Sequence, residues 1–273
     1  MENIKKHILR KMVKEEKPII YISIEGNIGV GKSMLLDKIL ENYYKIITQN
    51  KDKPTTNNLT ISILPEPINK WTEGEINLLE YYYKDKVQFA ELFQSIVQNG
   101  YMKSFLNVMY DFLQGIKYSK LNDEKPILFI ISERSPLIGI KIFTKILNKD
   151  GFIRDLFFTL YSDLIYDLKL GQQDIIIYIH DSRNEDIKNR IIKRGRQGEE
   201  YITNDFLDRV RDTHQELLEF DEKRNTNGYY LWDDKTLVIP LNNTNQAEIE
   251  KFASDFINTI SETVPCPIKK EKK

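Results

Sequence analysis

One segment near the N-terminus restricts the fold more than any other part of the chain. Residues 26–33 read GNIGVGKS and fit the pattern G-x-x-x-x-G-K-[ST] without a mismatch. The apolar run PIIYISIE (18–25) precedes this segment, and SMLLDKILENYYKII (33–47), with apolar residues at helical spacing, follows it. A strand, a glycine-rich turn and a helix in that order form the context in which this motif binds phosphate. The segment therefore predicts a phosphate-binding loop at the end of a parallel strand.

The composition of the loop indicates how it would hold a nucleoside triphosphate. Its backbone N–H groups can surround phosphate oxygens, and the start of the next helix adds a favourable dipole. We expect Lys32 to reach the β- and γ-phosphates of ATP and the Ser33 hydroxyl to bind Mg²⁺. The remaining loop residues expected to bind ATP are Gly26, Asn27, Ile28, Gly29, Val30 and Gly31. The alternative, a glycine-rich turn without a ligand, fits this context poorly.

Five unbroken, isoleucine-rich runs predict strands, at 19–24, 60–64, 127–131, 174–180 and 236–240. Unbroken apolar runs are typical of central parallel strands that are buried on both faces. Because helical patterns separate the runs, we expect an α/β fold of the P-loop NTPase type, a doubly wound five-stranded parallel sheet flanked by helices. A length of 273 residues suits one domain, which we place at 18–262. It would follow a solvated basic leader helix (1–17) and precede a polar tail (263–273).

Composition excludes several other classes of protein. With 40 basic and 41 acidic residues, the charge is nearly balanced and indicates no nucleic-acid partner. The longest apolar runs have strand length and are too short to span a membrane. The single cysteine, Cys266, rules out a disulfide framework and favours the cytoplasm or another reducing intracellular compartment.

Charged residues follow the second and third predicted strands, at the sheet edge where ligands bind in such folds. Glu66 lies between two prolines, which hold the backbone extended, so its carboxylate should point into the cleft beside the γ-phosphate. Glu133 could hold Mg²⁺, and Arg134 could bind both the transferred phosphoryl group and the acceptor oxygen. The alternatives are an exposed loop glutamate and a structural Glu–Arg ion pair.

The helix after the fourth strand ends in the basic segment RIIKRGR (190–196). Arg190 and Arg194 share a helix face, Gly195 ends the helix, and Arg196 follows directly. We interpret residues from about 190 to 203 as a lid that closes over phosphates. The alternative is a solvated basic helix end that the helix dipole favours.

Taken together, the segments GNIGVGKS, PEPINKW, LLEYYYKDKVQFAELFQ, ERSP and RIIKRGR resemble the deoxyribonucleoside kinase family, which includes animal thymidine and deoxycytidine kinases, an insect multisubstrate enzyme and viral thymidine kinases. The resemblance covers about 19–241. It implies an ATP- and Mg²⁺-dependent deoxynucleoside kinase that transfers the γ-phosphate to a nucleoside 5′-hydroxyl, and a homodimer joined through long helices. The substrate partner would be a deoxynucleoside, with thymidine and other pyrimidines expected.

The resemblance also implies roles for individual residues in the transfer step. Glu66 corresponds to the general base for the 5′-hydroxyl, and Arg134 to the arginine that holds that oxygen and the carboxylate. Glu133 corresponds to the acidic residue near Mg²⁺. The lid arginines correspond to Arg190, Arg194 and Arg196.

Further matches concern the nucleoside itself. Tyr83 corresponds to the tyrosine that contacts the 3′-hydroxyl, Phe93 to the aromatic residue that stacks on the base, and Gln94 to the amide that pairs with the base edge. Glu200 corresponds to the lid glutamate that also reaches the 3′-hydroxyl, with Glu199 as the alternative.

Helix geometry constrains this set. In one continuous helix, Tyr83 and Gln94 would be about 16 Å apart, which is long for a single nucleoside. We therefore predict a helix break near 84–86. Gln94, Val97, Gln98 and Tyr101 have i, i+3, i+4, i+7 spacing and should line the base pocket.

Two further positions bear on the choice of base. The Gln94 amide can pair with thymine or, turned over, with cytosine. In deoxycytidine-preferring relatives a charged arginine–aspartate pair lies beside the base, and the matching positions here are Tyr101 and Gly139. We expect Gly139 to leave room for a 5-methyl group, and thymidine to be used at least as well as deoxycytidine.

Two other functions stay open at this point. A thymidylate-type nucleotide kinase could share the scaffold, although it would need positive charge where Glu66 lies. A catalytically silent relative could serve as an assembly subunit, although its phosphate-loop and carboxylate positions should then be eroded.

Overall fold

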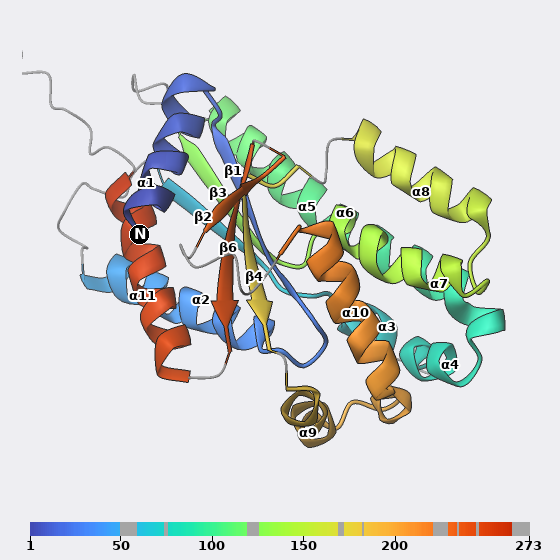
Figure 1. Cartoon of the computed structure of the whole chain (residues 1–273). Coiled ribbons are helices and arrows are strands. Elements are labelled where there is room, and N and C mark those ends of the chain that lie inside the picture. The colour runs from blue at the N-terminus through green and yellow to red at the C-terminus, as the bar shows by residue number, and fades with distance from the viewer. Residues whose placement is uncertain are drawn as a thin grey trace, which may run out of the picture.

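A computed structural model describes residues 1–49, 59–73, 76–118, 126–168, 172–181, 183–220, 229–233, 235–243 and 246–263. At its centre lies a six-stranded sheet in the order β2-β3-β1-β4-β6-β5 (Figure 1). The strands are β1 (Ile19–Gly26), β2 (Leu59–Leu64), β3 (Ile127–Glu133), β4 (Ile175–His180), β5 (Tyr230–Trp232) and β6 (Thr236–Asn242). The five predicted strands are all present, within a few residues of their expected ends.

The sixth strand is a correction to the predicted five-stranded parallel sheet. Strands β1, β2, β3, β4 and β6 pair in parallel, whereas β5 pairs antiparallel with β6 at the sheet edge. β5 has only three residues, and its central Leu231 is exposed. Such a short edge strand lacks the buried apolar run by which the other strands can be recognised.

Helices cover both faces of the sheet (Figure 1). On one face, α2 (Lys32–Gln49) and α11 (Gln246–Thr263) pack on the β1 side chains Ile20, Ile22 and Ile24. On the other face, α5 (Lys86–Tyr118) and α8 (Asp155–Asp167) share a core cluster with Tyr21. Buried side chains therefore alternate between two cores along β1, as expected of a central strand.

The N-terminal residues do not form the predicted solvated leader. Helix α1 (Glu2–Leu9) and the π-helical turn η1 (Arg10–Lys14) pack against the body of the protein, with Ile4 and Ile8 buried in the same core as α11. His7 Nε2 lies 2.9 Å from the Asp174 carbonyl oxygen. The basic composition suggested a solvated segment, but Ile4 and Ile8 are one turn apart and present an apolar edge that packs in the same core as α11.

The predicted break in the long helical stretch is confirmed. Helix α4 (Leu78–Lys84) ends before Asp85, and α5 begins at Lys86. Asp85 has non-helical backbone angles (φ −143°, ψ 85°), and its carboxylate accepts a hydrogen bond from the Gln88 N–H at 3.1 Å. An aspartate in this position is an N-cap, which starts a new helix without a proline.

The remaining elements connect these layers. They are α3 (Asn69–Thr72), α6 (Pro136–Gly139), the π-helical segment η3 (Ile140–Thr144), α7 (Lys145–Lys149), α9 (Asn184–Arg194), the 3₁₀ turn η4 (Glu199–Tyr201) and α10 (Asn204–Leu217). Residues 264–273, which include Cys266 and most of the predicted tail, lie outside the described part of the chain. Within the part that is described, no helix is both long and apolar enough to cross a membrane.

Candidate active site

The phosphate loop lies where β1 ends and α2 begins. Gly31 has φ +102°, and a Cβ there would lie 2.6 Å from the Asn243 side-chain nitrogen, so this turn admits only glycine. Lys32 Nζ donates to the Asn27 carbonyl at 2.7 Å. Burial, together with the positive charge of Arg134, lowers the pKa of Lys32 to about 7. The loop has the backbone shape and the cation that a polyphosphate requires.

The loop residues have different surroundings. Gly29 and Gly31 line a cavity together with Lys32 and Ser33. Asn27 anchors the loop by donating to the Leu207 carbonyl at 2.8 Å. Gly26 and Val30 lie in the loop backbone outside the cavity walls, and Ile28 lines a second cavity described below. This division fits ATP, whose phosphates would contact the loop backbone.

Ser33 and Glu133, the predicted Mg²⁺ ligands, lie within hydrogen-bond distance of each other. Ser33 Oγ donates to Glu133 Oε1 at 3.1 Å, and both residues line the phosphate-loop cavity. The described residues contain no group of three or more His, Cys, Asp or Glu that could hold a metal by themselves. A hydroxyl and one carboxylate suit Mg²⁺, which binds through few protein ligands and completes its shell with water and substrate phosphates.

Glu66 lies beside Arg134, as the sequence predicts. Arg134 Nε is 3.4 Å from Glu66 Oε1, and the Tyr101 hydroxyl donates to the same oxygen at 3.0 Å. Partial burial by itself would raise the pKa of Glu66, but Arg134 and Lys32 outweigh it and hold that pKa below its usual value. Glu66 is therefore an ionised acceptor next to the phosphate loop.

Arg134 has a backbone conformation that is unusual for its residue type. Its φ is +64°, a left-handed conformation that costs a non-glycine residue roughly 1–2 kcal/mol. Hydrogen bonds hold the turn: the Arg134 N–H donates to the Ile24 carbonyl at 3.0 Å, and Ser132 Oγ donates to the Arg134 carbonyl at 2.7 Å. The guanidinium donates to the Gly26 carbonyl at 2.9 Å and lies 4.7 Å from the centre of the Phe143 ring. The strained turn thus aims the arginine at the loop.

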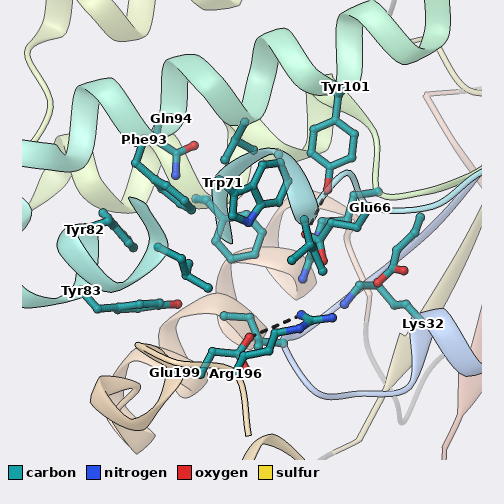
Figure 2. A pocket seen from close by; sticks show the side chains of 18 of the residues that line it. Lys32, Glu66, Trp71, Tyr82, Tyr83, Phe93, Gln94, Tyr101, Arg196 and Glu199 are labelled. Carbon is teal, nitrogen blue, oxygen red and sulfur yellow. Dashed lines mark hydrogen bonds and ion pairs between the residues drawn. The ribbon is translucent and has the colours of Figure 1, made fainter. Parts of the chain in front are cut away.

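A second, largely aromatic cavity opens beside Glu66 (Figure 2). In Figure 2, Phe93, Gln94 and Tyr101 project from α5 into the cavity, while Tyr83 and Glu199 lie across from them. Lys32 is at the Glu66 end and Gln94 is toward the other end. Its aromatic lining consists of Trp71, Tyr82, Tyr83, Phe93, Tyr101, Phe143 and Phe206. The shape and lining suit a flat heterocycle joined to a sugar.

Most of the predicted nucleoside-binding residues line this cavity. Tyr83, Phe93, Gln94, Val97, Tyr101 and Gly139 are all in its wall, and so is Gln98. Glu200 is not: it is exposed, and its carboxylate accepts a hydrogen bond from the Gly198 N–H at 2.6 Å. Glu199, the alternative candidate, is buried in the cavity wall, so of the two it is the residue placed to contact a ligand there.

The lid arginines divide between the two cavities. Arg190 donates to the Gly29 carbonyl at 2.9 Å and to Asp181 at 2.8 Å, in the phosphate-loop cavity. Arg194 lines both cavities and makes two hydrogen bonds to Glu199, at 3.0 and 2.6 Å. Arg196 lines the aromatic cavity, 3.5 Å from the same carboxylate. The predicted lid thus lies over the place where the two cavities meet.

Sequence reasoning missed several residues of the site, among them Trp71, Phe143 and Asn243. Trp71 resembles a packing residue, yet it lines the aromatic cavity between Phe93 and Tyr101. Phe143 lies in the π-helical η3, whose irregular period hides its direction. Asn243 follows β6, binds the Val30 carbonyl of the loop and lines the phosphate-loop cavity. Its position after the last parallel strand is the one signal that could have identified it.

The surroundings of Gly139 differ from what the sequence suggested. A Cβ at Gly139 would lie 3.2 Å from Nε2 of Gln98, so the Gln98 amide already occupies the space next to the glycine. Gly139 still lines the aromatic cavity, and it also makes room for this amide.

Comparison with known proteins agrees with this geometry. A family model described as deoxynucleoside kinase matches residues 22–265. The chain is 28% identical over 265 residues to deoxycytidine kinase of Bos taurus, covering 88% of this chain and 91% of the relative. It is 29% identical over 203 residues to a fowlpox virus protein named as a probable deoxycytidine kinase, covering 72% and 71% of the two chains. Deoxycytidine kinase 2 of Gallus gallus is 27% identical over 225 residues, covering 74% and 75%.

Proposed function

Because the chain belongs to the deoxynucleoside kinase family, which uses ATP with Mg²⁺, we propose that it phosphorylates the 5′-hydroxyl of pyrimidine deoxynucleosides. One observation carries the proposal. Glu66 lies between the phosphate loop and an aromatic cavity that contains Gln94, an amide able to pair with a base edge. ATP and the nucleoside together present a polyphosphate, a hydroxyl and a base. Each of these three groups thus has a matching chemical environment in the site.

The proposed transfer step uses groups that are already close together. Bound ATP supplies the phosphoryl group, and Mg²⁺ held at Ser33 and Glu133 would neutralise its charge. Glu66 accepts the hydrogen bond of the 5′-hydroxyl and takes its proton as the bond to the γ-phosphorus forms, while the bond from that phosphorus to the bridging oxygen breaks and ADP leaves. Lys32 and Arg134 stabilise the charge on the transferring group, and the lid adds Arg194. Catalysis of this kind consists mainly of positioning and electrostatics.

The sugar has candidate partners on the far side of the cavity. Burial raises the pKa of Tyr83 well above its usual value, so its hydroxyl remains a neutral donor. Glu199 lies nearby in the same wall and can accept a hydrogen bond. A tyrosine donor and a carboxylate acceptor suit a 3′-hydroxyl, which can both accept and donate. Phe93 offers an aromatic surface close to the Gln94 amide and supports stacking of the base.

The substrate class we propose comprises thymidine and deoxycytidine. The Gln94 amide is compatible with either base, and the three named relatives above bear the name deoxycytidine kinase. The sequence-based ranking of thymidine first rested on the absence of a charged pair at Tyr101 and Gly139 and on space at Gly139, part of which the Gln98 amide takes.

An ATP-consumption assay tests the proposal with four conditions: thymidine, deoxycytidine, thymidylate and no acceptor. We expect turnover with one or both nucleosides and background turnover with thymidylate. Turnover with thymidylate alone would identify a nucleotide kinase instead. Nucleotide binding without any turnover would identify a silent assembly subunit.

We also propose that the chain forms a homodimer through α5 and α8. On α8, Leu156, Leu160 and Leu164 are four residues apart and all exposed, which places an apolar stripe on one helix face. On the C-terminal half of α5, Leu106, Tyr110 and Leu113 are exposed apolar residues. The two helices share a core cluster on one face of the sheet, and exposed apolar surface on such helices is typical of an interface.

A further inference from the structure

Gln98 carries a buried polar group that the proposed reaction does not explain. The side chain is in the wall of the aromatic cavity, and only 1% of the residue is exposed. Its Oε1 is fully enclosed and has no hydrogen-bond partner within the described part of the chain. A buried carbonyl without a partner costs about 1–3 kcal/mol, and in a native protein such a group calls for an explanation.

The neighbouring amide is in a different situation. Gln94 lies one helical turn before Gln98 on the same face of α5. Its Oε1 accepts a hydrogen bond from the buried Thr144 hydroxyl at 3.1 Å. Thr144 therefore fixes the acceptor end of Gln94 and leaves the Nε2 donor for a ligand. Gln98, by contrast, offers an acceptor that nothing in the described protein uses.

Gly139 holds the second amide in place on the other side. Because a Cβ at this position would approach Gln98 Nε2 to 3.2 Å, the glycine is what permits the amide to lie there. The cavity wall thus presents a donor from Gln94 and contains, one turn apart, the Gln98 amide, whose enclosed Oε1 would reach a ligand after rotation of the amide. An adjacent donor and acceptor form a reading pattern for a base edge.

We infer that Gln98 is a second base-reading residue, an inference that rests on the proposed function. Gln98 accepts a hydrogen bond from the exocyclic amino group of cytosine and so favours deoxycytidine over thymidine. Cytosine presents the N3 acceptor, which matches the Gln94 donor, and an amino group with two hydrogens. The carbonyls of Gln94 and Gln98 can each accept one of these hydrogens, since an amide oxygen has two lone pairs. Thymine has the O4 carbonyl where cytosine has the amino group, so O4 and the Gln98 carbonyl oxygen, which are both acceptors, would face each other.

The test combines a protein change with a change in the substrate. Gln98→Met keeps an unbranched side chain of similar length and removes the amide. Three nucleosides are compared: deoxycytidine, thymidine, and the 2-pyrimidinone deoxynucleoside, which has no group at C4. We expect kcat/KM for deoxycytidine to fall about 5- to 100-fold, the range for losing the partner of a buried polar group. The other two nucleosides should change by less than about threefold.

Two further variants keep the test independent of folding. Asn99→Met changes an exposed amide on the same helix and should leave the ratio of deoxycytidine to thymidine unchanged. Gly139→Ala keeps Gln98 but pushes its amide away, and should lower the same ratio.

Three outcomes would overturn the inference. One is wild-type preference for thymidine, and another is an unchanged ratio in Gln98→Met. The third is an equal loss on the 2-pyrimidinone nucleoside. All three leave nucleoside phosphorylation intact, whereas a wild-type protein that phosphorylates no nucleoside would overturn the proposed function as well.

Discussion

At the scale of single residues, the site depends on carboxylates in contrasting environments. Glu66 keeps 20% of its side chain exposed and has Arg134 at 3.4 Å, so it stays ionised. Glu25, at the end of β1, is completely buried, and burial raises its pKa to about 7 although Arg134 partly offsets the effect. Environment, rather than residue type, therefore decides which carboxylate is available as a proton acceptor.

The first prediction concerns Glu66 as the general base. Glu66→Gln keeps the size and the hydrogen bonding but removes the proton acceptor. We expect kcat to fall about 10²–10⁴-fold with nucleoside affinity largely retained. Steady-state kinetics and equilibrium binding of the nucleoside measure the two effects. Glu41→Gln, an exposed glutamate on α2, is the matched control, and near-wild-type kcat in Glu66→Gln would rule out the assigned role.

A second prediction concerns the pH dependence of stability. Between pH 4.5, the ordinary pKa of a glutamate, and about 7, the folded protein keeps the Glu25 proton while the unfolded chain has released it. The free energy of unfolding must then decrease as pH rises through this window, by about 3 kcal/mol in total from this group. In Glu25→Gln this contribution should be absent.

Urea unfolding at pH about 4.5 and about 7.5, for wild type and Glu25→Gln, measures the difference. Other titrating groups contribute equally to both proteins, so the difference between the two pH dependences isolates Glu25. Parallel pH dependences would show that Glu25 is ionised in the folded protein.

At the scale of secondary-structure elements, the lid joins the two halves of the site. Ile187 and Ile191 fix α9 in a core cluster, while Gly195 ends the helix with φ +67°. The C-terminal end of the lid packs on α4, where a Cβ at Gly198 would lie 2.8 Å from the Glu80 Cα. The segment between these anchors carries the lid arginines, so its position determines whether charge is available over the phosphates.

We predict that Arg194→Ala lowers kcat more than it weakens ATP binding. The contact of Arg194 with the transferring phosphoryl group should strengthen as charge develops in the transition state. Single-turnover kinetics and ATP titration separate the two quantities. Lys193→Ala, which removes an exposed charge from the same helix end, serves as the control. A loss of ATP affinity at constant kcat would show that Arg194 only binds ground-state ATP.

At the scale of the whole molecule, the sheet order brings distant segments to one edge. β1 lies between β3 and β4, so the phosphate loop adjoins Glu133 and Arg134 on one side and the start of the lid helix on the other. β2 follows on the far side of β3 and places Glu66 beside Arg134. The active site is thus a consequence of strand order, and the long α5 closes it as the wall of the aromatic cavity.

The proposed dimer makes a prediction at this scale. Leu160, in the middle of the exposed stripe on α8, is 58% exposed, so Leu160→Glu should not disturb the monomer core. In a dimer it would bury an unpaired charge, and we expect dissociation to monomers. Sedimentation velocity measures the change, with Val13→Glu, an exposed apolar residue on η1, as the control. A wild-type monomer, or a dimer that tolerates Leu160→Glu, would contradict the interface.

The sequence by itself determined the local features of this protein. Three features depend on contiguous residues: the phosphate loop, the five parallel strands and the charged residues after them. The geometry of a tight turn or burial on both faces of a sheet directly sets the residue pattern of such a segment. The break before α5 could also be predicted, because the spacing of Tyr83 and Gln94 required it. β5, with three residues and no buried run, has no such signal.

Only the tertiary structure decided which side chains meet. The burial of α1, the position of Glu199 rather than Glu200 in the cavity wall, and the place of Phe143 depend on elements that approach from distant parts of the chain. The same holds at Gly139, where sequence indicates a missing side chain but not that the Gln98 amide occupies the space. Close packing lets a neighbour fill any volume that one residue leaves, so the occupant of a space is a property of the whole fold.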